Sequence, residues 1–288
     1  MTATILDGKQ ARDFFKKELI EKIQRGEKTP RLAIVQVGKR ADSNAYIEQK
    51  LKFGAGVGVN VEHVQFDEDI TQENVIKEIE ALNEDVDIDG IIVQLPLPDS
   101  LNTYSIIESI DPKKDVDGLT AVNVKLLQNG GLEGFMPATA KGIESLLRYY
   151  DISIEGKHAV VVGRSQLVGA PVARMLINHG ATVTVCHSLT QNMSHYTKDA
   201  DILVVAAGHP HLITKEYVEE GQVVIDVGIN LLDGTPLQEE LPDQKFTGDV
   251  DFKGVSEIVR AISPSPGGVG PMTVLSLFEN VVKASLQN

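Results

Sequence analysis

The sequence predicts an α/β protein with two domains, and three observations lead to this prediction. Short apolar runs alternate along the chain with segments of helical periodicity, which is typical of parallel sheets covered by helices. The length of 288 residues is enough for about two domains with separate cores. The composition changes after Gly130-Gly131, where residues 135–139 are expected to cross into a second domain. We therefore expect domains over residues 1–139 and 140–273, with a C-terminal helix, residues 274–288, that completes the first.

The composition excludes several classes of partner and site. A net charge of -14 argues against a nucleic-acid partner, because phosphate backbones are bound by clustered Lys and Arg. The single cysteine excludes an intrachain disulfide, and no Cys/His cluster has zinc-ligand spacing, so no metal is expected. No apolar stretch approaches the ~20 residues of a membrane span, and the N-terminus lacks a signal-peptide pattern. We expect a soluble cytoplasmic protein without a membrane partner.

The first half of the chain predicts helices and strands in alternation. The expected elements are a helix with the stripe Phe14, Phe15, Leu19 and Ile23; a strand over residues 32–37; a helix capped by Ser43 that carries Tyr46, Lys50 and Gly54; a strand with Val57, Val59 and Val61; a helix with Val75, Ile76 and Ile79; and a strand over residues 88–93. Ligands collect beyond the carboxyl ends of parallel strands. Three segments are therefore expected at one rim: the loop after Val37, the turn 94–98 and the loop 111–120.

Tyr46 and Lys50 are four residues apart on a predicted helix, so they share one face of it. A lysine held near an aromatic ring and away from water can lose proton affinity and act as a general acid or base. A solvated lysine beside a half-buried tyrosine is the more common arrangement at this spacing, so both interpretations stay open. Lys52 is expected on another face, as a surface charge.

Gln94 and Asp117 are the polar candidates in the other two rim segments. Gln94 precedes a turn with two prolines, which fixes the direction of its side chain, and an amide can both donate and accept hydrogen bonds. It is equally compatible with a simple strand terminator. Asp117 precedes Gly118 in a loop that lacks the spacing of a calcium site. Its carboxylate can accept two N–H bonds from a nitrogen-rich ring, or it belongs to a solvated turn.

The second half contains a strand, a glycine turn and a helix that favour dinucleotide binding. Residues 159–162 form an apolar β-branched run that ends at Gly163, and a helical stripe follows at Val168, Val172, Met175 and Leu176. A helix that begins there offers free N–H groups to a phosphate. The match to GxGxxG is weak, since Ser165 replaces the second glycine and Gly169 comes late. A nucleophile elbow around Ser165 is excluded because Leu167 occupies its last glycine position.

The next strand favours NADP over NAD. The run 181–186 ends in Cys186-His187-Ser188, without the carboxylate that usually binds the ribose diol of NAD. Arg164 lies in the phosphate turn itself, and a cation without a competing acid favours a 2′-phosphate.

The remaining helices and strands are expected in the order typical of a dinucleotide-binding domain. A lead-in helix carries Ile143, Leu146 and Leu147, and later strands cover residues 202–206 and 223–227. Glycine follows each strand, at Gly208 and Gly228, which lets the backbone approach a ligand closely. The loop 263–273 has three prolines and three glycines, so we expect a rigid loop that returns the chain to the first domain before an apolar helix over residues 274–282.

Seven motifs follow one another along the chain: SNAYIEQKLK, VQLPLP, DVDGL, VVGRSQLVGAP, TVTVCHS, VVIDVGIN and SPGGVGPMT. On these motifs the chain resembles the bifunctional methylenetetrahydrofolate dehydrogenase/cyclohydrolase family, from about Val37 to Thr273. The resemblance implies an N-terminal folate-side domain and a Rossmann-type NADP-binding domain with a cleft between them. It implies oxidation of 5,10-methylenetetrahydrofolate by NADP and hydrolysis of the methenyl product to 10-formyltetrahydrofolate, in one-carbon metabolism and purine biosynthesis. It also implies a homodimer paired through the cofactor domains.

The resemblance assigns roles to the candidate residues. Lys50 would be the main proton-handling group, Tyr46 would line the folate site against the pterin, and Gln94 would hydrogen-bond near the lysine. Asp117 would anchor the amino-pyrimidine edge of the pterin. The remaining assignments are Gly163, Arg164 and Ser165 at the cofactor phosphates, Ser188 with Arg164 at the 2′-phosphate, Ile229 at the nicotinamide end, and Pro264, Gly267 and Gly268 in a loop near the folate.

The chain departs from the family pattern at Pro137-Ala-Thr-Ala140, where the family usually has PCTP. We expect Ala138 and Ala140 to alter hinge stiffness, which leaves the balance of the two activities open. A monofunctional dehydrogenase and a non-catalytic NADP-binding module are the alternatives, and the presence of Lys50 and Gln94 speaks against the first.

Overall fold

The computed structural model describes residues 3–131, 133–231 and 246–287, without the side chains of residues 41, 42, 45 and 231. By its internal contacts the chain divides into two compact units. Of the described residues, the six-stranded unit holds 3–14, 139–231 and 246–273, and the three-stranded unit holds 15–131, 133–138 and 274–287. Residues 3–14 lie with the second half of the chain, unlike the division expected from the sequence, because strand β1 (Thr4–Ile5) pairs with strand β11 (Ala261–Ile262).

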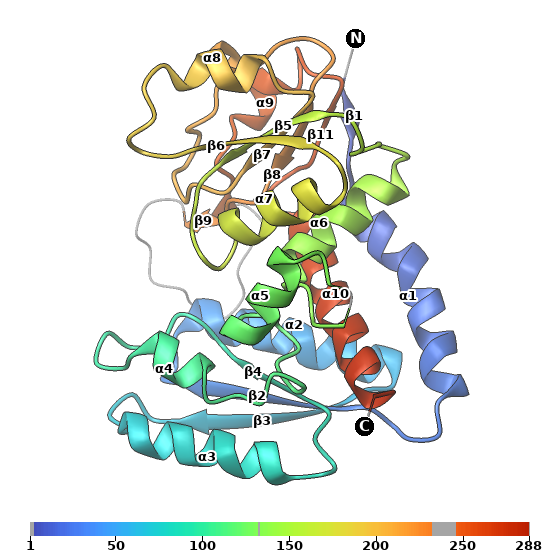
Figure 1. Ribbon diagram of the computed structural model, residues 1–288, viewed down its shortest axis with the longest axis vertical. Coiled ribbons are helices and arrows are strands. Elements are labelled where there is room, and N and C mark those ends of the chain that lie inside the picture. Colours follow the sequence, from blue (N-terminus) through green and yellow to red (C-terminus); the bar gives the residue numbers. More distant parts are fainter. Residues whose placement is uncertain (1–2, 132, 232–245, 288) are drawn as a thin grey trace. The chain divides into compact units, whose positions relative to one another are not determined.

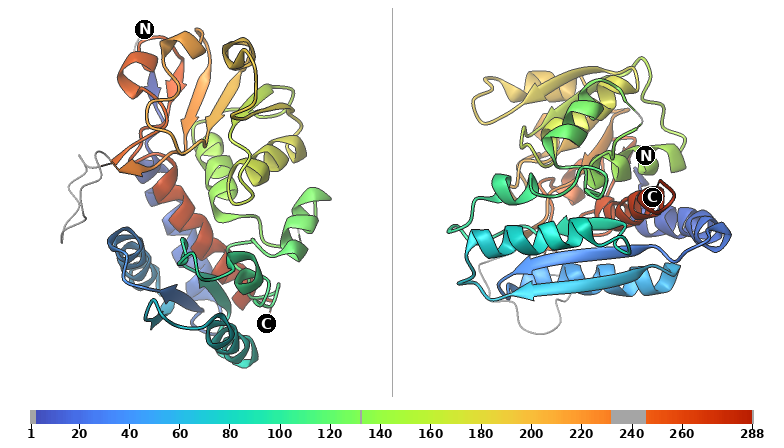
Figure 2. Two further views of the ribbon diagram at one scale, coloured as in Figure 1. Left: turned by 90° about the vertical axis from the view of Figure 1, so that its left-hand side faces the viewer. Right: turned by 60° about the horizontal axis from the view of Figure 1, so that its bottom comes forward.

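The three-stranded unit contains a small parallel sheet in the order β3-β2-β4 (Figure 1). Its elements are part of α1 (Gly8–Arg25), then β2 (Arg31–Val37), α2 (Ala41–Val57), β3 (Asn60–Phe66), α3 (Gln72–Glu84), β4 (Gly90–Val93), α4 (Thr103–Ile107), α5 (Ala121–Gln128) and most of α10 (Val269–Ser285). Helices cover both faces of the sheet, with α3 on one and α2 on the other (Figure 2).

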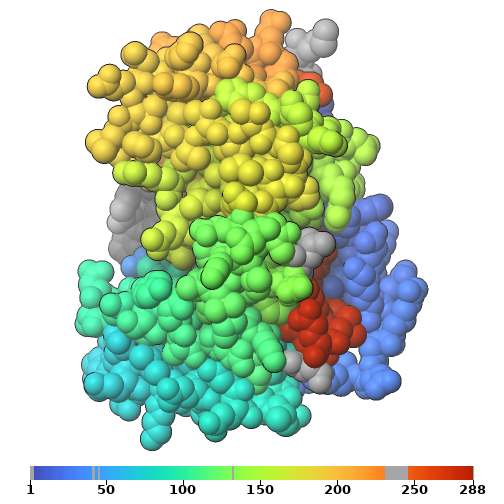
Figure 3. All heavy atoms as spheres, viewed as in Figure 1, coloured from blue at the N-terminus to red at the C-terminus, as the bar shows by residue number. Residues whose placement is uncertain are grey.

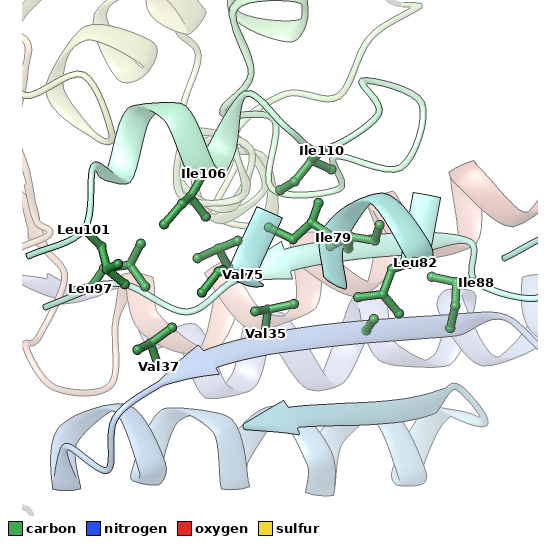
Figure 4. Packing of buried hydrophobic residues seen from close by; sticks show 13 residues of the cluster. Val35, Val37, Val75, Ile79, Leu82, Ile88, Leu97, Leu101, Ile106 and Ile110 are labelled. Atoms are coloured by element: carbon green, nitrogen blue, oxygen red, sulfur yellow. The ribbon is translucent and has the colours of Figure 1, made fainter. Parts of the chain in front are cut away.

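Side chains along β2 point alternately to the two faces of the sheet, and each face packs against its own set of helices. Val35 and Val37 face α3, where Val75, Ile79 and Leu82 are buried against them (Figure 4). On the opposite face, α2 approaches the sheet closely at Gly54, since a Cβ built there would lie 2.5 Å from a methyl carbon of Val61. The ring of Phe53 lies 5.2 Å from that of Phe278 on α10. These contacts fix the position of α2, the helix that carries Lys50.

Two details of the expected elements around α2 are wrong. Ser43 is not the cap, because α2 begins at Ala41, its N-cap is Arg40, and Ser43 lies buried inside the first turn. Val57 ends α2 and does not begin a strand. Gly58, with a φ of +88°, ends this helix in the left-handed conformation, and β3 starts only at Asn60.

The six-stranded unit contains a parallel sheet in the order β1-β11-β8-β7-β5-β6. Its further elements are α6 (Ala138–Tyr149), β5 (His158–Val162), α7 (Gly169–Asn178), β6 (Thr182–Cys186), α8 (Met193–Lys198), β7 (Ile202–Val205), a 3₁₀ turn (Lys215–Tyr217), β8 (Val223–Asp226), the short antiparallel pair β9 (Asn230–Leu231) and β10 (Phe246–Thr247), and α9 (Phe252–Val255).

The central strand β5 is buried on both faces, as its unbroken apolar run predicts. Val160 and Val162 belong to a core cluster with Ile213 and Val255. The alternate residues of β5 face the other side, where α7 packs on β5 and β6. In Figure 3 the side chains around α7, in yellow, form part of the surface of this unit on the face in view. The predicted class, α/β with parallel sheets, is confirmed for the described residues.

The last helix begins earlier than expected. Helix α10 starts at Val269, so residues 269–273 of the loop predicted over residues 263–273 are helical. Within the described part of the chain, no helix is both long and apolar enough to cross a bilayer.

Candidate functional site

Lys50 and Gln94 are in direct contact. The ammonium Nζ of Lys50 on α2 donates a hydrogen bond of 2.8 Å to Oε1 of Gln94, which follows β4. The amide Nε2 of Gln94 donates to the carbonyl oxygen of Leu95 at 2.8 Å, which fixes the orientation of the amide. The turn therefore holds one oxygen toward the lysine, and the two residues, 44 positions apart in sequence, form one unit.

Asp117 is the second charged group at Lys50. Burial lowers the pKa of Lys50, and the negative charge of Asp117 raises it again. Burial raises the pKa of Asp117 to about 6, while the Lys50 charge lowers it and the Asp115 charge raises it. No described residue donates a hydrogen bond to the half-buried Asp117 carboxylate. An amine with weakened proton affinity thus lies near a carboxylate whose acceptor sites are free for a ligand.

The loop that carries Asp117 is folded around the buried carboxylate of Asp115. Oδ2 of Asp115 accepts hydrogen bonds from the Thr120 amide at 2.8 Å, the Thr120 hydroxyl at 2.7 Å and Nδ2 of Asn123 at 2.9 Å. Gly118 has a φ of +71°, and a Cβ there would lie 2.5 Å from the carbonyl oxygen of Phe135. The conformation beside Asp117 therefore requires glycine.

Helix α10 also holds this loop. Nδ2 of the buried Asn280 donates to the carbonyl oxygens of Val116 at 2.9 Å and Met136 at 3.0 Å. Residues 274–287 thus contribute to the three-stranded unit by fixing the residue before Asp117.

Tyr46 lies one turn before Lys50 on α2 and is half-buried. The structure places Lys50, Gln94 and Asp117 together, with Tyr46 on the same helix as Lys50. Such an arrangement can bind a polar ring through the carboxylate and transfer a proton through the amine.

The turn after β5 fits a dinucleotide phosphate. Gly163 has a φ of +120°, and a Cβ there would overlap the carbonyl group of Ala206. A Cβ on Gly169 would overlap the Gly163 carbonyl, so this late glycine lets α7 begin directly against the turn. The hydroxyl of Ser165 accepts hydrogen bonds of 3.3 Å from the amides of Val168 and Gly169, at the first residues of α7. The strand, tight turn and helix N-terminus of a phosphate site are all present.

Arg164 and Ser188 follow the carboxyl ends of neighbouring strands. Val162 of β5 pairs with Cys186 of β6, and Arg164 and Ser188 are both exposed just beyond this pair. Among the described residues, Arg164 takes part in no ion pair. Its charge is available to an anion such as a 2′-phosphate, and no carboxylate follows β6 to compete with it.

Two buried carboxylates lie beyond the ends of β7 and β8, and the sequence analysis did not identify them as functional. Asp226 ends β8 and Asp249 follows β10. Burial and the Asp249 charge raise the pKa of Asp226 to about 7, against the lowering effect of backbone hydrogen bonds. The signal in the sequence is an acid that closes an otherwise apolar strand, VVID. The half-exposed Ile229 comes three residues after Asp226.

Pro264, Gly267 and Gly268 belong to the six-stranded unit, between β11 and α10. The Gly268 amide donates to the Pro264 carbonyl at 2.8 Å, and Gly267 has a φ of +109°. The Gly8 amide donates to the Gly267 carbonyl at 2.9 Å. The segment is a compact turn, as its composition predicts.

Asp115, Asn123 and Asn280 were also missed by the sequence analysis. Asp115 belongs to the DVDGL motif, where two acids separated by one residue point in different directions. No local pattern marks Asn280, because its partner Val116 is 164 residues away.

Comparison with known proteins gives a consistent result. The model of the tetrahydrofolate dehydrogenase/cyclohydrolase catalytic domain matches residues 6–117, and that of the NAD(P)-binding domain of the same family matches residues 137–288. The bifunctional protein FolD of Bacillus subtilis is 43% identical over 289 residues, which cover 99% of this chain and 98% of that protein.

Solved structures agree with the sequence matches. The bifunctional FolD from Campylobacter jejuni has a TM-score of 0.92 at 43% identity, covering 99% of each chain. The methylenetetrahydrofolate dehydrogenase-cyclohydrolase of Trypanosoma brucei, crystallised with NADP and an inhibitor, has a TM-score of 0.93 at 36% identity, covering 100% of this chain and 98% of that one. The resemblance predicted from seven motifs is confirmed, and the chain belongs to the tetrahydrofolate dehydrogenase/cyclohydrolase family.

Proposed function

We propose that Lys50, Gln94 and Asp117 form the folate-side reaction site of this enzyme, with Lys50 as its proton-handling group. The chain is an NADP-dependent methylenetetrahydrofolate dehydrogenase and a methenyltetrahydrofolate cyclohydrolase. The three-stranded unit, with residues 274–287, has the folate role in this proposal, and the six-stranded unit has the NADP role.

The two activities place different demands on the protein. In the first, the methylene carbon of 5,10-methylenetetrahydrofolate loses a hydride, for which bound NADP supplies the acceptor, and a methenyl cation remains. This step depends on how the reactants are held. In the second, water adds to the methenyl carbon and loses a proton, which gives a neutral carbinolamine. One carbon–nitrogen bond then breaks: its nitrogen gains a proton, and the hydroxyl loses its proton as the formyl C=O forms, so one proton is released overall. The product is 10-formyltetrahydrofolate.

The Lys50–Gln94 hydrogen bond carries the proposal for the second activity. Burial lowers the pKa of Lys50, which increases the fraction of neutral amine that can take a proton from water. The resulting ammonium can return a proton to the leaving nitrogen. The Gln94 oxygen, 2.8 Å from Nζ, orients the amine in both states. A monofunctional dehydrogenase would have no use for this pair.

The other site residues hold the two ligands. The free acceptor sites of Asp117 suit two adjacent N–H groups on the amino-pyrimidine edge of the pterin, and Tyr46 lines the pterin. Gly163, Arg164 and Ser165 hold the cofactor phosphates, with Ser188 beside Arg164 at the 2′-phosphate. Ile229 lies against the nicotinamide end. Pro264, Gly267 and Gly268 form the loop near the folate.

We also propose a cytoplasmic homodimer that supplies formyl groups to purine biosynthesis. Strand β6 is an outermost strand of its sheet, and its Val185 is 40% exposed. Leu189, just beyond it, is 75% exposed. An apolar sheet edge is a surface for pairing with another chain. Light scattering that gave the mass of one chain, or cell fractionation that placed the protein elsewhere, would contradict these assignments.

The test of the reaction site is Lys50→Met. Loss of the amine should lower the cyclohydrolase rate by about 10²–10⁴-fold, the usual contribution of a general acid or base. NADP binding, measured by calorimetry, should stay within about twofold, because the substitution leaves the six-stranded unit unchanged.

The matched control is Lys52→Met. Lys52 forms an exposed pair with Glu48 at 2.7 Å, and its loss should cost only about 0.3–0.5 kcal/mol. Both activities should remain within twofold of the wild type. Normal hydrolysis of methenyltetrahydrofolate by Lys50→Met, or equal losses in the two variants, would refute the role of Lys50.

A further inference from the structure

The two buried carboxylates of the six-stranded unit organise three separate loops. Oδ1 of Asp226 accepts hydrogen bonds of 3.0 Å from the amides of Gly228 and Asp249, and its Oδ2 accepts one of 3.1 Å from the Val250 amide. The loop after β8 and the segment after β10 are therefore both tied to Asp226.

Asp249 extends the same network to the loop after β7. Its Oδ2 accepts from the amides of Ala207 at 2.7 Å and Gly208 at 2.8 Å, and its Oδ1 accepts from Nδ2 of Asn230 at 2.8 Å. No described lysine or arginine forms an ion pair with either acid. Two anions are thus balanced only by N–H dipoles, an arrangement that costs desolvation free energy and calls for an explanation beyond packing.

Two glycines around the network let the loop backbone pack directly against the carboxylates. A Cβ on Gly228 would overlap the Asp249 carboxylate, and a Cβ on Gly248 would overlap that of Asp226. The hydroxyl of Ser265 donates a hydrogen bond of 2.5 Å to the Gly228 carbonyl. Residues 228–230 therefore rest directly on the acids, and the half-exposed Ile229 is held between two anchored neighbours, Gly228 and Asn230.

The order of the strands indicates which part of the cofactor these loops meet. The phosphate turn follows β5, and Ser188 follows β6 on one side of it. The loops after β7 and β8 lie on the other side of β5. A dinucleotide that crosses this edge with its 2′-phosphate at β6 must extend its nicotinamide half toward β7 and β8.

We propose that Asp226 and Asp249 are positioning residues for the nicotinamide half of NADP, which act through the backbone of residues 207–208 and 228–230. This inference rests on the proposed function of the six-stranded unit. The acids do not touch the cofactor in this scheme. They fix the surface on which its ring rests, and their negative charge complements the cationic ring of the oxidised cofactor.

The experiment compares two ligands in the intact protein. NADP contains the nicotinamide half, whereas adenosine 2′,5′-bisphosphate contains only the adenosine and its 2′-phosphate. In Asp249→Asn, calorimetry should show NADP affinity reduced by about tenfold or more, since a charged acceptor of three N–H groups is lost. The affinity for adenosine 2′,5′-bisphosphate should remain within about twofold. The cyclohydrolase rate, assayed from methenyltetrahydrofolate without cofactor, should stay within threefold.

Two further variants keep the test decisive. Asp251→Asn removes an acid two residues along, which caps α9 through a 3.2 Å bond from the Gly254 amide, and it should bind both ligands as the wild type does. Asn230→Ala removes the half-buried amide that donates to Oδ1 of Asp249. This variant tests the positioning role if Asp249→Asn does not fold. It should weaken NADP by about threefold and leave adenosine 2′,5′-bisphosphate unchanged.

The outcomes separate this inference from the proposed function. Equal weakening of both ligands would identify the acids as a general scaffold and overturn the inference, as would unchanged NADP binding in Asp249→Asn and Asn230→Ala. A wild-type protein that bound both ligands but converted no folate would refute the proposed function, while the ratio of the two affinities would still decide the inference.

Discussion

The two units of this protein each contain a pair of buried or half-buried acids, and the pairs are built differently. In the three-stranded unit, Asp115 has its carboxylate occupied by hydrogen bonds from its own loop, whereas no described residue donates to Asp117. In the six-stranded unit, both Asp226 and Asp249 are occupied by N–H donors. A cation, Lys50, lowers the pKa of Asp117, whereas no described lysine or arginine forms an ion pair with Asp226 or Asp249.

Whether a carboxylate has free acceptor sites distinguishes an acid that can bind a ligand from an acid that only holds the surrounding backbone in position. A carboxylate with free acceptor sites can exchange hydrogen bonds with water for bonds with a ligand. A carboxylate saturated by backbone amides can only hold those amides in place. Burial and a raised pKa are common to Asp117 and Asp226, so neither property alone identifies a binding residue.

The largest effect that tests this comparison is expected for Asp117→Asn. An amide presents a donor where the carboxylate offers acceptors, so one N–H group of the pterin would be left unpaired in a partly buried site. We expect kcat/KM to fall by about a hundredfold or more for both activities, because both use the folate. Asp249→Asn should affect NADP alone. If steady-state kinetics showed that Asp117→Asn lowers only the dehydrogenase activity, Asp117 would behave like Asp249. The proposed distinction between the two pairs of acids would then be wrong.

Periodicity and spacing predicted the elements of both sites but not the contacts between the site residues. The strands, the rim formed by their carboxyl ends and the candidates on it followed from apolar periodicity and strand ends. The hydrogen bond between Lys50 and Gln94 did not follow from spacing, because it depends on β2 lying beside β4 in the sheet, and only the family resemblance implied it. The C-terminal helix was expected to complete the first domain, but the hydrogen bond of its Asn280 was not, because the partner Val116 lies 164 residues earlier.

Local patterns were also misleading where tertiary contacts decide the backbone. The alternation of Val57, Val59 and Val61 resembles a strand, but Gly58 allows α2 to end in the left-handed conformation between them. Gly169 came too late for the usual dinucleotide fingerprint, although it permits the close approach of α7 to the turn. Asp226 was counted only as part of the strand over residues 223–227, because two of its partners, the amides of Asp249 and Val250, lie 23 and 24 residues later.

A smaller effect is expected from the titration of Asp117. Its pKa of about 6 means that the carboxylate becomes protonated, and loses acceptor sites, as the pH falls through 6. Folate affinity should then fall by up to about tenfold per pH unit below that value. The Lys50 charge lowers this pKa and the Asp115 charge raises it, so Lys50→Met should move the transition upward and Asp115→Asn should move it downward. Calorimetric titration with a folate analogue between pH 5 and 8 measures both shifts. A downward shift in Lys50→Met, or an upward shift in Asp115→Asn, would exclude this electrostatic arrangement.

The smallest effect is expected from Asp226, because its titration reaches the cofactor only through the backbone. Burial and the neighbouring Asp249 charge raise its pKa to about 7, so its carboxylate is the main form above pH 7. Protonation as the pH falls through 7 weakens the bonds from the Gly228, Asp249 and Val250 amides, and NADP should bind about threefold more weakly at pH 6 than at pH 8. The 2′-phosphate titrates in the same range, but adenosine 2′,5′-bisphosphate carries it too. The ratio of the two affinities cancels that contribution. A ratio that stayed constant from pH 6 to 8 would mean that the proton on Asp226 does not reach the loop of Ile229, and that the second pair of acids holds its loops in either state of charge.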